Sequence, residues 1–461
     1  MQKIEDILQK IRTWSSAQEH YMGFIVACSA VVGCLAGFGA FILKRVIYYV
    51  ALWLHKGLSH VSLERFHADW WLLVLPLIGI LIAVAWQKWV ARANMVHCTK
   101  HIVEYLNSKN YAIPARMTYD PIAACGITLG FGGSAGAEGP IAYAGAAVGS
   151  KLGRLLGLDS DMLRVLIGIG AGAGIAGIFK SPIAGVLFAL EVLRMDMAAG
   201  PVVGLVMACI CASVTCYAFT GTHLYLPFYT DPGRGVPIHW VMALGVFCGI
   251  YAVAYNHITI VMRRFFESRK RQWVTWLTGG LIAGASLLAF PCIYGEGYPV
   301  MTRLINGDSD ILQSGLLAVS SGDTSHFLWV LGLLLIVKAL ATVCSNSAGG
   351  VAGDFAPTLF AGAVAGTLFS LLANHLLGID IPVSLCALFA MAGTFAGTIH
   401  APVMAIFLIT EMTGMTKYML PVTVCALFAY ITVKIVTPAS RYVETRYDDL
   451  ASLFMKPKNK S

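Results

Sequence analysis

Charged residues are scarce in this sequence: Asp, Glu, Lys and Arg together make up 12% of the 461 residues. A soluble domain carries about a quarter of such residues, so this composition excludes an ordinary soluble enzyme or binding module. Hydrophobic residues reach 57%, and the mean hydropathy is +0.73. Apolar runs long enough to cross a bilayer recur along the chain. We therefore expect a multi-pass protein embedded in a lipid bilayer.

Acidic residues are fewer than basic ones, which gives a net charge of +8. The basic residues gather near the chain ends and in loops instead of forming one patch, so nucleic acid is not an expected partner. An excess of Lys and Arg marks the cytoplasmic loops of membrane proteins. The basic groups within Lys3–Arg12, Arg263–Arg271 and Lys456–Lys460 therefore predict a cell-membrane protein with both termini in the cytoplasm. Residues 1–20 lack the apolar core of a cleavable signal peptide.

Metal-binding patterns are also missing. The 12 cysteines form no C-x-x-C pair and show no zinc spacing, and H-E-x-x-H is absent. We interpret the cysteines as small buried apolar residues. We expect no metal, no cofactor and no catalytic residue.

One carboxylate, Glu138, stands out within a glycine-rich apolar segment. The segment reads Gly133-Ser134-Ala135-Gly136-Ala137-Glu138-Gly139-Pro140. Proline is favoured at the first position of a helix, so a helix is expected to begin here inside the membrane. Its start would expose unpaired N–H groups and the positive end of the helix dipole, which together form an anion site. An acidic residue at membrane depth is a functional candidate by default.

The same segment recurs in the second half of the chain. Offset by 217, the matching pairs are Gly136/Gly353, Pro140/Pro357, Ala144/Ala361, Gly145/Gly362, Ala146/Ala363 and Gly149/Gly366. Offset by 220, Pro182 and Glu191 correspond to Pro402 and Glu411. Gly- and Pro-interrupted apolar segments at matching places in two halves point to a binding site between repeats near the bilayer midplane.

The predicted organisation has four parts. They are a cytoplasmic amphipathic helix at 1–20, a first transmembrane repeat at 21–236, a second at 237–440 and a cytoplasmic tail at 441–461. Apolar segments are expected near 21–52, 70–90, 165–193, 200–228, 238–262, 273–294, 326–343, 382–412 and 418–437. Several are short and broken by Gly or Pro, which the membrane tolerates only where protein or a water-filled cavity covers the backbone.

With these motifs in view, the sequence resembles the CLC family of chloride channels and chloride/proton exchangers over essentially its whole length. The segment 136–140 is similar to the family's G-(R/K)-E-G-P motif, and 353–357 is similar to its G-x-F-x-P motif. The segment 440–442 is similar to the C-terminal stretch that supplies a pore tyrosine. The resemblance implies an all-α polytopic membrane fold with two inverted repeats and broken helices. It also implies a homodimer with one chloride pathway in each subunit.

Site residues follow from the resemblance. Glu138 would be the gate, because its charged form would occupy an anion position and its protonation would swing it away. The residues that would bind the anion are Gly136, Gly139, Phe355, Ala356 and Tyr442. Phe355 is also compatible with an ordinary core aromatic role. Tyr442 is equally compatible with a place in an interfacial aromatic belt.

Several positions depart from the family pattern. The Gly-Ser-Gly-x-Pro motif expected upstream of the gate is absent from the window 94–101. By spacing, His97 takes the place of the serine, where it would make conduction pH-dependent; Cys98 and Thr99 are alternatives. His97 is equally compatible with a histidine at a helix end that binds no ligand. Because the motif is absent, the preferred halide stays open, since the fluoride-exporting branch of the family departs at the same motif.

Two further departures from the family pattern lie next to the expected helix starts, and a third affects the expected proton pathway. Ala137 replaces a basic residue, and Asp354 replaces an aliphatic residue and is expected to cap the second helix start. Val192 occupies the position of the internal proton-relay glutamate of many exchangers, and valine cannot carry a proton. Glu191 and Glu411 are expected to be structural helix-end groups. The predicted function is therefore channel-like chloride permeation gated by protonation of Glu138, with a proton-coupled chloride or fluoride antiporter as the alternative.

A different class of function is also open. Gly132 to Gly136 fits G-x-S-x-G, the elbow of serine hydrolases, with Ser134 as the nucleophile. The motif needs a strand–turn–helix context or a partner histidine, and no histidine in the spans is tied to Ser134 by the repeat. A cation carrier is disfavoured because only one acidic group lies near the predicted site.

Overall fold

The computed structural model describes residues 21–57, 70–108, 111–195, 199–229, 232–308, 310–312, 315–319 and 324–437. Most of these residues lie in helices, and the part described contains one isolated β-bridge and no strand. The all-α prediction is confirmed. The predicted helix at 1–20 and the predicted tail at 441–461, with Tyr442, lie outside the described residues.

The helices divide at the loop between Thr220 and Ile238. Those before it are α2 (Tyr21–Gly57), α3 (Trp71–Ala85), α4 (Cys98–Asn107), α5 (Asp120–Gly130), α6 (Glu138–Leu156), α7 (Ser160–Phe179), α8 (Pro182–Leu187) and α9 (Ala199–Thr220). Those after it are α10 (Ile238–Glu267), α11 (Gln272–Ala289), α12 (Tyr298–Ile305), α13 (Thr324–Ser347), α14 (Phe355–Leu377), α15 (Val383–Ile399), α16 (Pro402–Thr413) and α17 (Met419–Val436).

By length and composition, eight helical segments among the described residues could cross a membrane. Shorter apolar helices lie between them, at Pro182–Val192, Val383–Ile399 and Pro402–Thr413. The apolar stretch 382–412 is broken at His400, whose backbone adopts a left-handed conformation with φ 61°. The broken helices that the Gly and Pro pattern predicts are therefore present. The short helices α4 and α12 were missed, because neither lies in a long apolar run.

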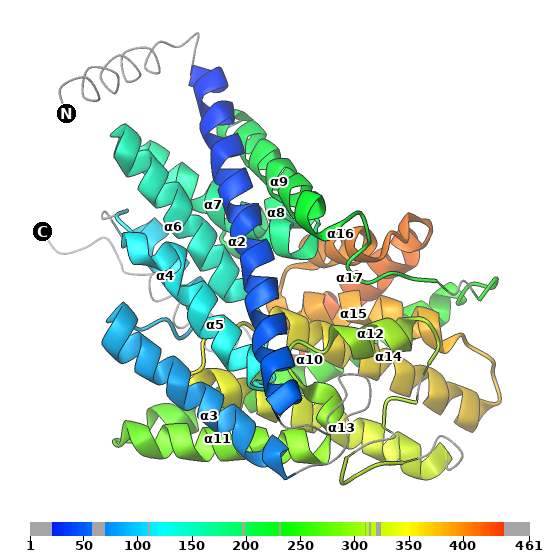
Figure 1. Ribbon diagram of the computed structural model, residues 1–461. Coiled ribbons are helices and arrows are strands. Elements are labelled where there is room, and N and C mark those ends of the chain that lie inside the picture. Colours follow the sequence, from blue (N-terminus) through cyan, green and yellow to red (C-terminus); the bar gives the residue numbers. More distant parts are fainter. Residues whose placement is uncertain are drawn as a thin grey trace, which may run out of the picture.

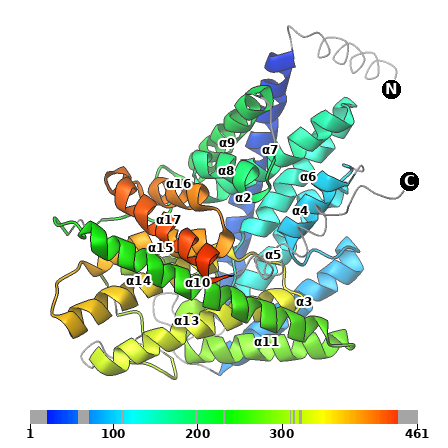
Figure 2. The same cartoon turned by 180° about the vertical axis from the view of Figure 1, so that it is seen from behind.

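The two halves are built alike and interlock (Figures 1 and 2). In the first half α6 packs on α7, and a methyl group added at Gly145 would overlap the Gly170 carbonyl. In the second half α14 packs on α15, and a methyl group added at Gly362 would overlap the Ala390 carbonyl. The two contacts are equivalent in the repeat, because Gly362 is offset from Gly145 by 217 residues and Ala390 from Gly170 by 220. The halves also pack on each other where α3 meets α11 at the lower side of Figure 1.

Hydrogen bonds between the halves are reciprocal. The Ser134 N–H donates to the Ser345 hydroxyl at 3.2 Å, and the Val351 N–H donates to the Thr128 hydroxyl at 3.2 Å. Thr128 and Ser345 are 217 residues apart, as are Ser134 and Val351. The two hydrogen bonds are therefore the same contact in both directions: each half donates one to the other half and accepts one from it. Two copies of one unit related by a pseudo-two-fold axis produce this pattern.

Glu191 and Glu411 extend the reciprocity. The Glu191 carboxylate accepts hydrogen bonds from the Val403 and Met404 N–H groups at the start of α16, at 3.2 and 2.7 Å. The Glu411 carboxylate accepts from the Ile183 and Ala184 N–H groups at the start of α8, at 3.1 and 3.0 Å. Each carboxylate therefore caps a helix of the other half. This agrees with the structural role expected for both residues.

Replacing Glu191 by alanine is expected to destabilise the folded protein by about 1–2 kcal/mol, because the first N–H groups of α16 lose their acceptor. The measurement is the midpoint of thermal unfolding in detergent. Glu104→Ala is the matched control, since this side chain is 40% exposed and pairs with His101 on its own helix. A Glu191→Ala protein as stable as the control would contradict the capping role.

Candidate functional site

The starts of α6 and α14 meet at the centre of the molecule. Gly136 and Gly353 form an antiparallel bridge, in which the Gly136 N–H donates to the Gly353 carbonyl at 2.8 Å and the Gly353 N–H donates back at 2.6 Å. These two residues are equivalents in the repeat. A residue that pairs with its own equivalent lies on the pseudo-two-fold axis, so the two helix starts must face one region.

Glu138 is the first residue of α6 and is 1% exposed. Its Oε1 accepts a hydrogen bond from the Ala356 N–H at the start of α14, at 3.0 Å. The Tyr298 hydroxyl donates to the same oxygen at 3.2 Å. The carboxylate of one half therefore lies on the N-terminus of the helix from the other half, where N–H groups and the helix dipole favour negative charge.

The other carboxylate oxygen of Glu138 has no hydrogen-bond partner among the described residues. It lies against Gly136 and Gly353: a methyl group added at Gly136 would overlap it, and one at Gly353 would stand 3.2 Å from it. The absence of side chains at these two glycines therefore makes room for the carboxylate. The Gly136 N–H is engaged in the bridge, so Gly136 contributes space and not a free donor.

Phe355 is the first residue of α14 and is 6% exposed. Its ring packs edge-on against Phe188 and Phe395, with centroids 5.9 and 5.0 Å away. It also lines a cavity, so its packing in the core does not exclude a place at the site. The expected cap by Asp354 is wrong: its side chain makes no capping bond at α14 and accepts from the Asn346 amide at 2.7 Å.

A small cavity of about 110 Å³, here called the inner cavity, reaches these helix starts. Its lining residues are His97, Cys98, Thr99, Lys100, Gly139, Val192, Arg263, Asn346, Ala352, Gly353, Asp354, Phe355 and Ile399. This lining includes four of the predicted site positions, His97, Gly139, Val192 and Phe355. Glu138 itself is not in the lining but directly precedes Gly139 in the chain.

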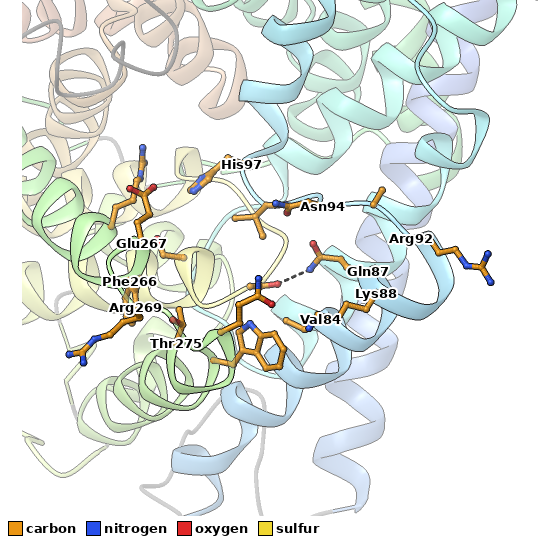
Figure 3. Close-up of a pocket in the computed structure, with 17 residues that line it drawn as sticks. Val84, Gln87, Lys88, Arg92, Asn94, His97, Phe266, Glu267, Arg269 and Thr275 are labelled. Carbon is orange, nitrogen blue, oxygen red and sulfur yellow. Dashed lines mark hydrogen bonds between the residues drawn. The ribbon is translucent and has the colours of Figure 1, made fainter. Parts of the chain in front are cut away.

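A wider cavity of about 700 Å³ adjoins the inner one, because both are lined by His97 and Arg263 (Figure 3). The basic residues in its lining are Lys88, Arg92, Arg263 and Arg269, against the single acid Glu267. In Figure 3 the loop before α4 faces the ends of α10 and α11 across it. An excess of positive charge raises the local concentration of anions. Arg263 lies near the end of α10, within the basic stretch Arg263–Arg271.

The window 94–101, where the serine motif was expected, leads into the start of α4. His97 has a left-handed backbone with φ 60° immediately before this helix and lines both cavities. Thr99 and Cys98 lie close to Gly139, since a methyl group added at Gly139 would stand 3.6 Å from the Thr99 hydroxyl and 3.7 Å from Cys98. Arg263 of α10 was missed, because nothing in its local sequence ties it to the motif.

A cluster on the other side of Glu138 was also missed. Lys44 of α2 pairs with both carboxylate oxygens of Glu296 at 2.8 and 2.6 Å. The Lys44 ammonium lies 4.8 Å from the ring centroids of Tyr225 and Tyr298. These residues come from three distant segments of the chain. The sequence signal that could have identified the cluster was the acidic residue in Gly295-Glu296-Gly297-Tyr298, at the start of a short helix.

Ser134 pairs with a buried lysine. Its hydroxyl accepts a hydrogen bond from the Lys338 amine at 2.8 Å, an arrangement that some serine hydrolases use. Ser134 is 1% exposed and Lys338 0%, and neither lines the inner or the wider cavity. Both side chains are therefore buried away from these two cavities. The Lys338 amine also lies 4.7 Å from the Phe360 ring centroid, which favours a structural pairing.

Within the part of the chain that the structure describes, no group of three or more His, Cys, Asp or Glu side chains is arranged to hold a metal ion. The chemistry of the site comes instead from backbone N–H groups, one carboxylate and nearby basic side chains. Such a site can bind an anion and exchange it for the carboxylate.

Comparison with known proteins gives a consistent picture. Residues 78–434 match the sequence model of the family described as voltage gated chloride channel. A ClcB-like protein of Ralstonia nicotianae is 27% identical over 422 residues, which cover 88% of this chain and 93% of that protein. The H(+)/Cl(-) exchange transporter ClcA of Vibrio parahaemolyticus is 27% identical, covering 88% of this chain and 86% of its own.

Among solved structures, that of a slow cyanobacterial Cl-/H+ antiporter matches with a TM-score of 0.73 and 21% identity. The match covers 94% of this chain and 98% of that one. At this identity the likeness concerns the fold, and it confirms the polytopic arrangement of broken helices.

Proposed function

The chain belongs to the voltage-gated chloride channel (CLC) family, and from that premise we propose that Glu138 gates a chloride pathway through each subunit. The observation that carries the proposal is the hydrogen bond from the Ala356 N–H to the Glu138 carboxylate. A carboxylate on a helix N-terminus occupies the place of an anion. The gate therefore stands in the site that it controls.

The mechanism is a competition between two negative groups for one set of donors. N–H groups at the starts of α6 and α14 replace the hydration of the chloride ion, as selectivity filters do with backbone groups. At high pH the charged Glu138 competes for these donors and excludes the anion. Protonation removes its charge, and chloride from the inner cavity then binds in its place. Flux is therefore expected to rise as the pH falls.

The basic lining of the wider cavity supports entry of anions from that side of the protein, which the excess of basic residues predicts to be cytoplasmic. Anions would collect there and pass His97 and Arg263 into the inner cavity. Thr99, close to Gly139, is the hydroxyl best placed to take the role of the missing serine. Tyr442 is proposed on the resemblance alone as a further donor. We further propose that the protein is a homodimer in the cell membrane, with both termini in the cytoplasm.

We propose permeation that is not coupled to protons. Val192 lines the inner cavity at the position where many exchangers carry a proton-relay glutamate, and an isopropyl group cannot bind a proton. Proton-coupled exchange of chloride or fluoride is the second candidate. It is favoured by the relative in Vibrio parahaemolyticus, whose name describes a chloride/proton exchanger.

The test uses the purified protein in liposomes under an outward chloride gradient, with the potential clamped by a potassium ionophore. Chloride efflux without a change in external pH is the expected result, because no side chain at position 192 relays protons. The matched reference is Val192→Glu, which restores a carboxylate to the inner cavity. Sustained proton uptake that reverses with the gradient would instead establish exchange. Replacing chloride with fluoride in the same assay separates the two anions.

A further inference from the structure

We infer that Tyr298 is a latch on the gate: its hydroxyl keeps the charged Glu138 carboxylate in the anion position, and the Lys44–Glu296 ion pair keeps the tyrosine in place. The inference rests on the proposed gating role of Glu138. It adds a positioning residue outside the motifs, on a short helix that the sequence pattern did not predict.

The contact between latch and gate is direct and buried. Tyr298 is 9% exposed and Glu138 1%. The hydroxyl lies 3.2 Å from Oε1, the same oxygen that accepts the Ala356 N–H. Hydrogen bonds to a charged acceptor are stronger than those between neutral groups. The Tyr298 hydroxyl therefore stabilises the state in which the carboxylate is charged and the anion is excluded.

The surroundings of Tyr298 fix its ring. The Tyr225 ring meets it edge-on, with centroids 4.7 Å apart. The Lys44 ammonium lies 4.8 Å from the centroids of both rings, within the range of a cation–π contact. Glu296, two residues before Tyr298, binds this ammonium through both oxygens. The ion pair thus ties α2 to the chain segment that carries the latch.

The cluster is less deeply buried than the Glu138 carboxylate. The Lys44 side chain is 22% exposed and that of Glu296 10%, whereas Glu138 is almost fully buried. Lys44 lies 23 residues into α2, which places it roughly 35 Å along the helix from Tyr21. If Tyr21 is at the cytoplasmic side, the latch is on the external side of the gate.

Several titratable groups face Glu138 from the elements packed around it. They are Lys44 of α2, Cys125 of α5, Tyr225 after α9, Glu296 and Tyr298 at α12, and Lys338 of α13. Among them, Tyr298 is the one with a hydrogen bond to the carboxylate in the described structure. Removing its hydroxyl therefore changes the gate while leaving all formal charges in place.

The experiment is Tyr298→Phe, measured as chloride flux from liposomes across a pH series. Without the hydrogen bond the charged carboxylate leaves the anion site more easily, so flux above the midpoint is expected to rise about tenfold. The pH of half-maximal flux is expected to move up by about one unit, because a tenfold change in this equilibrium equals one pH unit. Tyr251→Phe is the control, since its hydroxyl bonds the Leu335 carbonyl away from the gate.

The double variant separates the latch from the gate. In Glu138→Gln the added Tyr298→Phe change is expected to have no further effect, because there is no charged carboxylate to hold. If Glu138→Gln removes the pH response but Tyr298→Phe behaves like Tyr251→Phe, the latch is refuted and the gate stands. If Glu138→Gln keeps the pH response, the proposed function itself fails.

Discussion

Replacing Glu138 by glutamine is expected to abolish the activation of chloride flux by acid. Glutamine has nearly the same size and can still accept the Ala356 N–H, but it carries no charge at any pH. In the wild type the protonated fraction of the gate falls about tenfold for each pH unit above its midpoint, and flux should fall with it. The variant is therefore expected to conduct at alkaline pH as fast as it does at acidic pH.

Chloride efflux from liposomes between pH 4.5 and 8.5 measures this response. His97→Gln is the matched comparison, because His97 is the other titratable side chain that the sequence places in the pathway, and it lines both cavities. If Glu138 is the gate, chloride flux in His97→Gln should depend on pH as it does in the wild type. If flux no longer depends on pH in His97→Gln but still depends on pH as in the wild type in Glu138→Gln, then His97 and not Glu138 is the gate.

Gly136→Ala is expected to open the gate without removing its charge. A methyl group at this position would overlap Oε2 of Glu138. That oxygen is at the end of a flexible side chain, so the carboxylate should move away while the backbone bridge to Gly353 stays intact. Gly136 does not have the positive φ that would exclude alanine. Flux at alkaline pH should then rise toward the level of Glu138→Gln, roughly tenfold if one hydrogen bond to the charged group is lost.

The control for this change is Gly39→Ala on α2. A methyl group there would stand 3.5 and 3.6 Å from the ends of Ile122 and Ile141, which are ordinary contacts. Both variants are first checked for a single species by size-exclusion chromatography in detergent. A folded Gly136→Ala protein with the wild-type pH profile would show that the carboxylate does not rest against Gly136.

The sequence predicted a buried carboxylate at the start of a helix because its signal is local. A carboxylate among glycines before a proline, within an apolar run, is rare enough to single out Glu138 from the chain alone. The repeat at an offset of 217 identified Gly353 in the same way, and the resemblance to the family motif at 353–357 identified Phe355. By contrast, Asp354 was assigned a capping role from its position, and the structure gives its carboxylate to Asn346 instead. A side chain with two possible partners cannot be assigned from local sequence.

The residues around the gate could not be predicted, since they come from distant parts of the chain. Tyr298 is 160 residues from Glu138 and lies in a helix of only eight residues, which is too short for its hydrophobic pattern to predict it. Lys44 and Glu296 are 252 residues apart. Arg263 reaches the entrance only because α10 ends beside the loop before α4. No spacing rule connects such residues, so only their packing reveals them.

Sequence alone determined that this protein is a membrane-embedded pair of repeats with one titratable group at a helix start. Composition and internal repetition are properties of the chain, and burial of apolar surface in a bilayer follows from them directly. Tertiary structure alone decided that Gly136 pairs with Gly353, that α14 receives the Glu138 carboxylate, and that Tyr298 contacts it. The reason is physical: a hydrogen bond needs two groups about 3 Å apart, and the distance between remote residues is set by how whole helices pack.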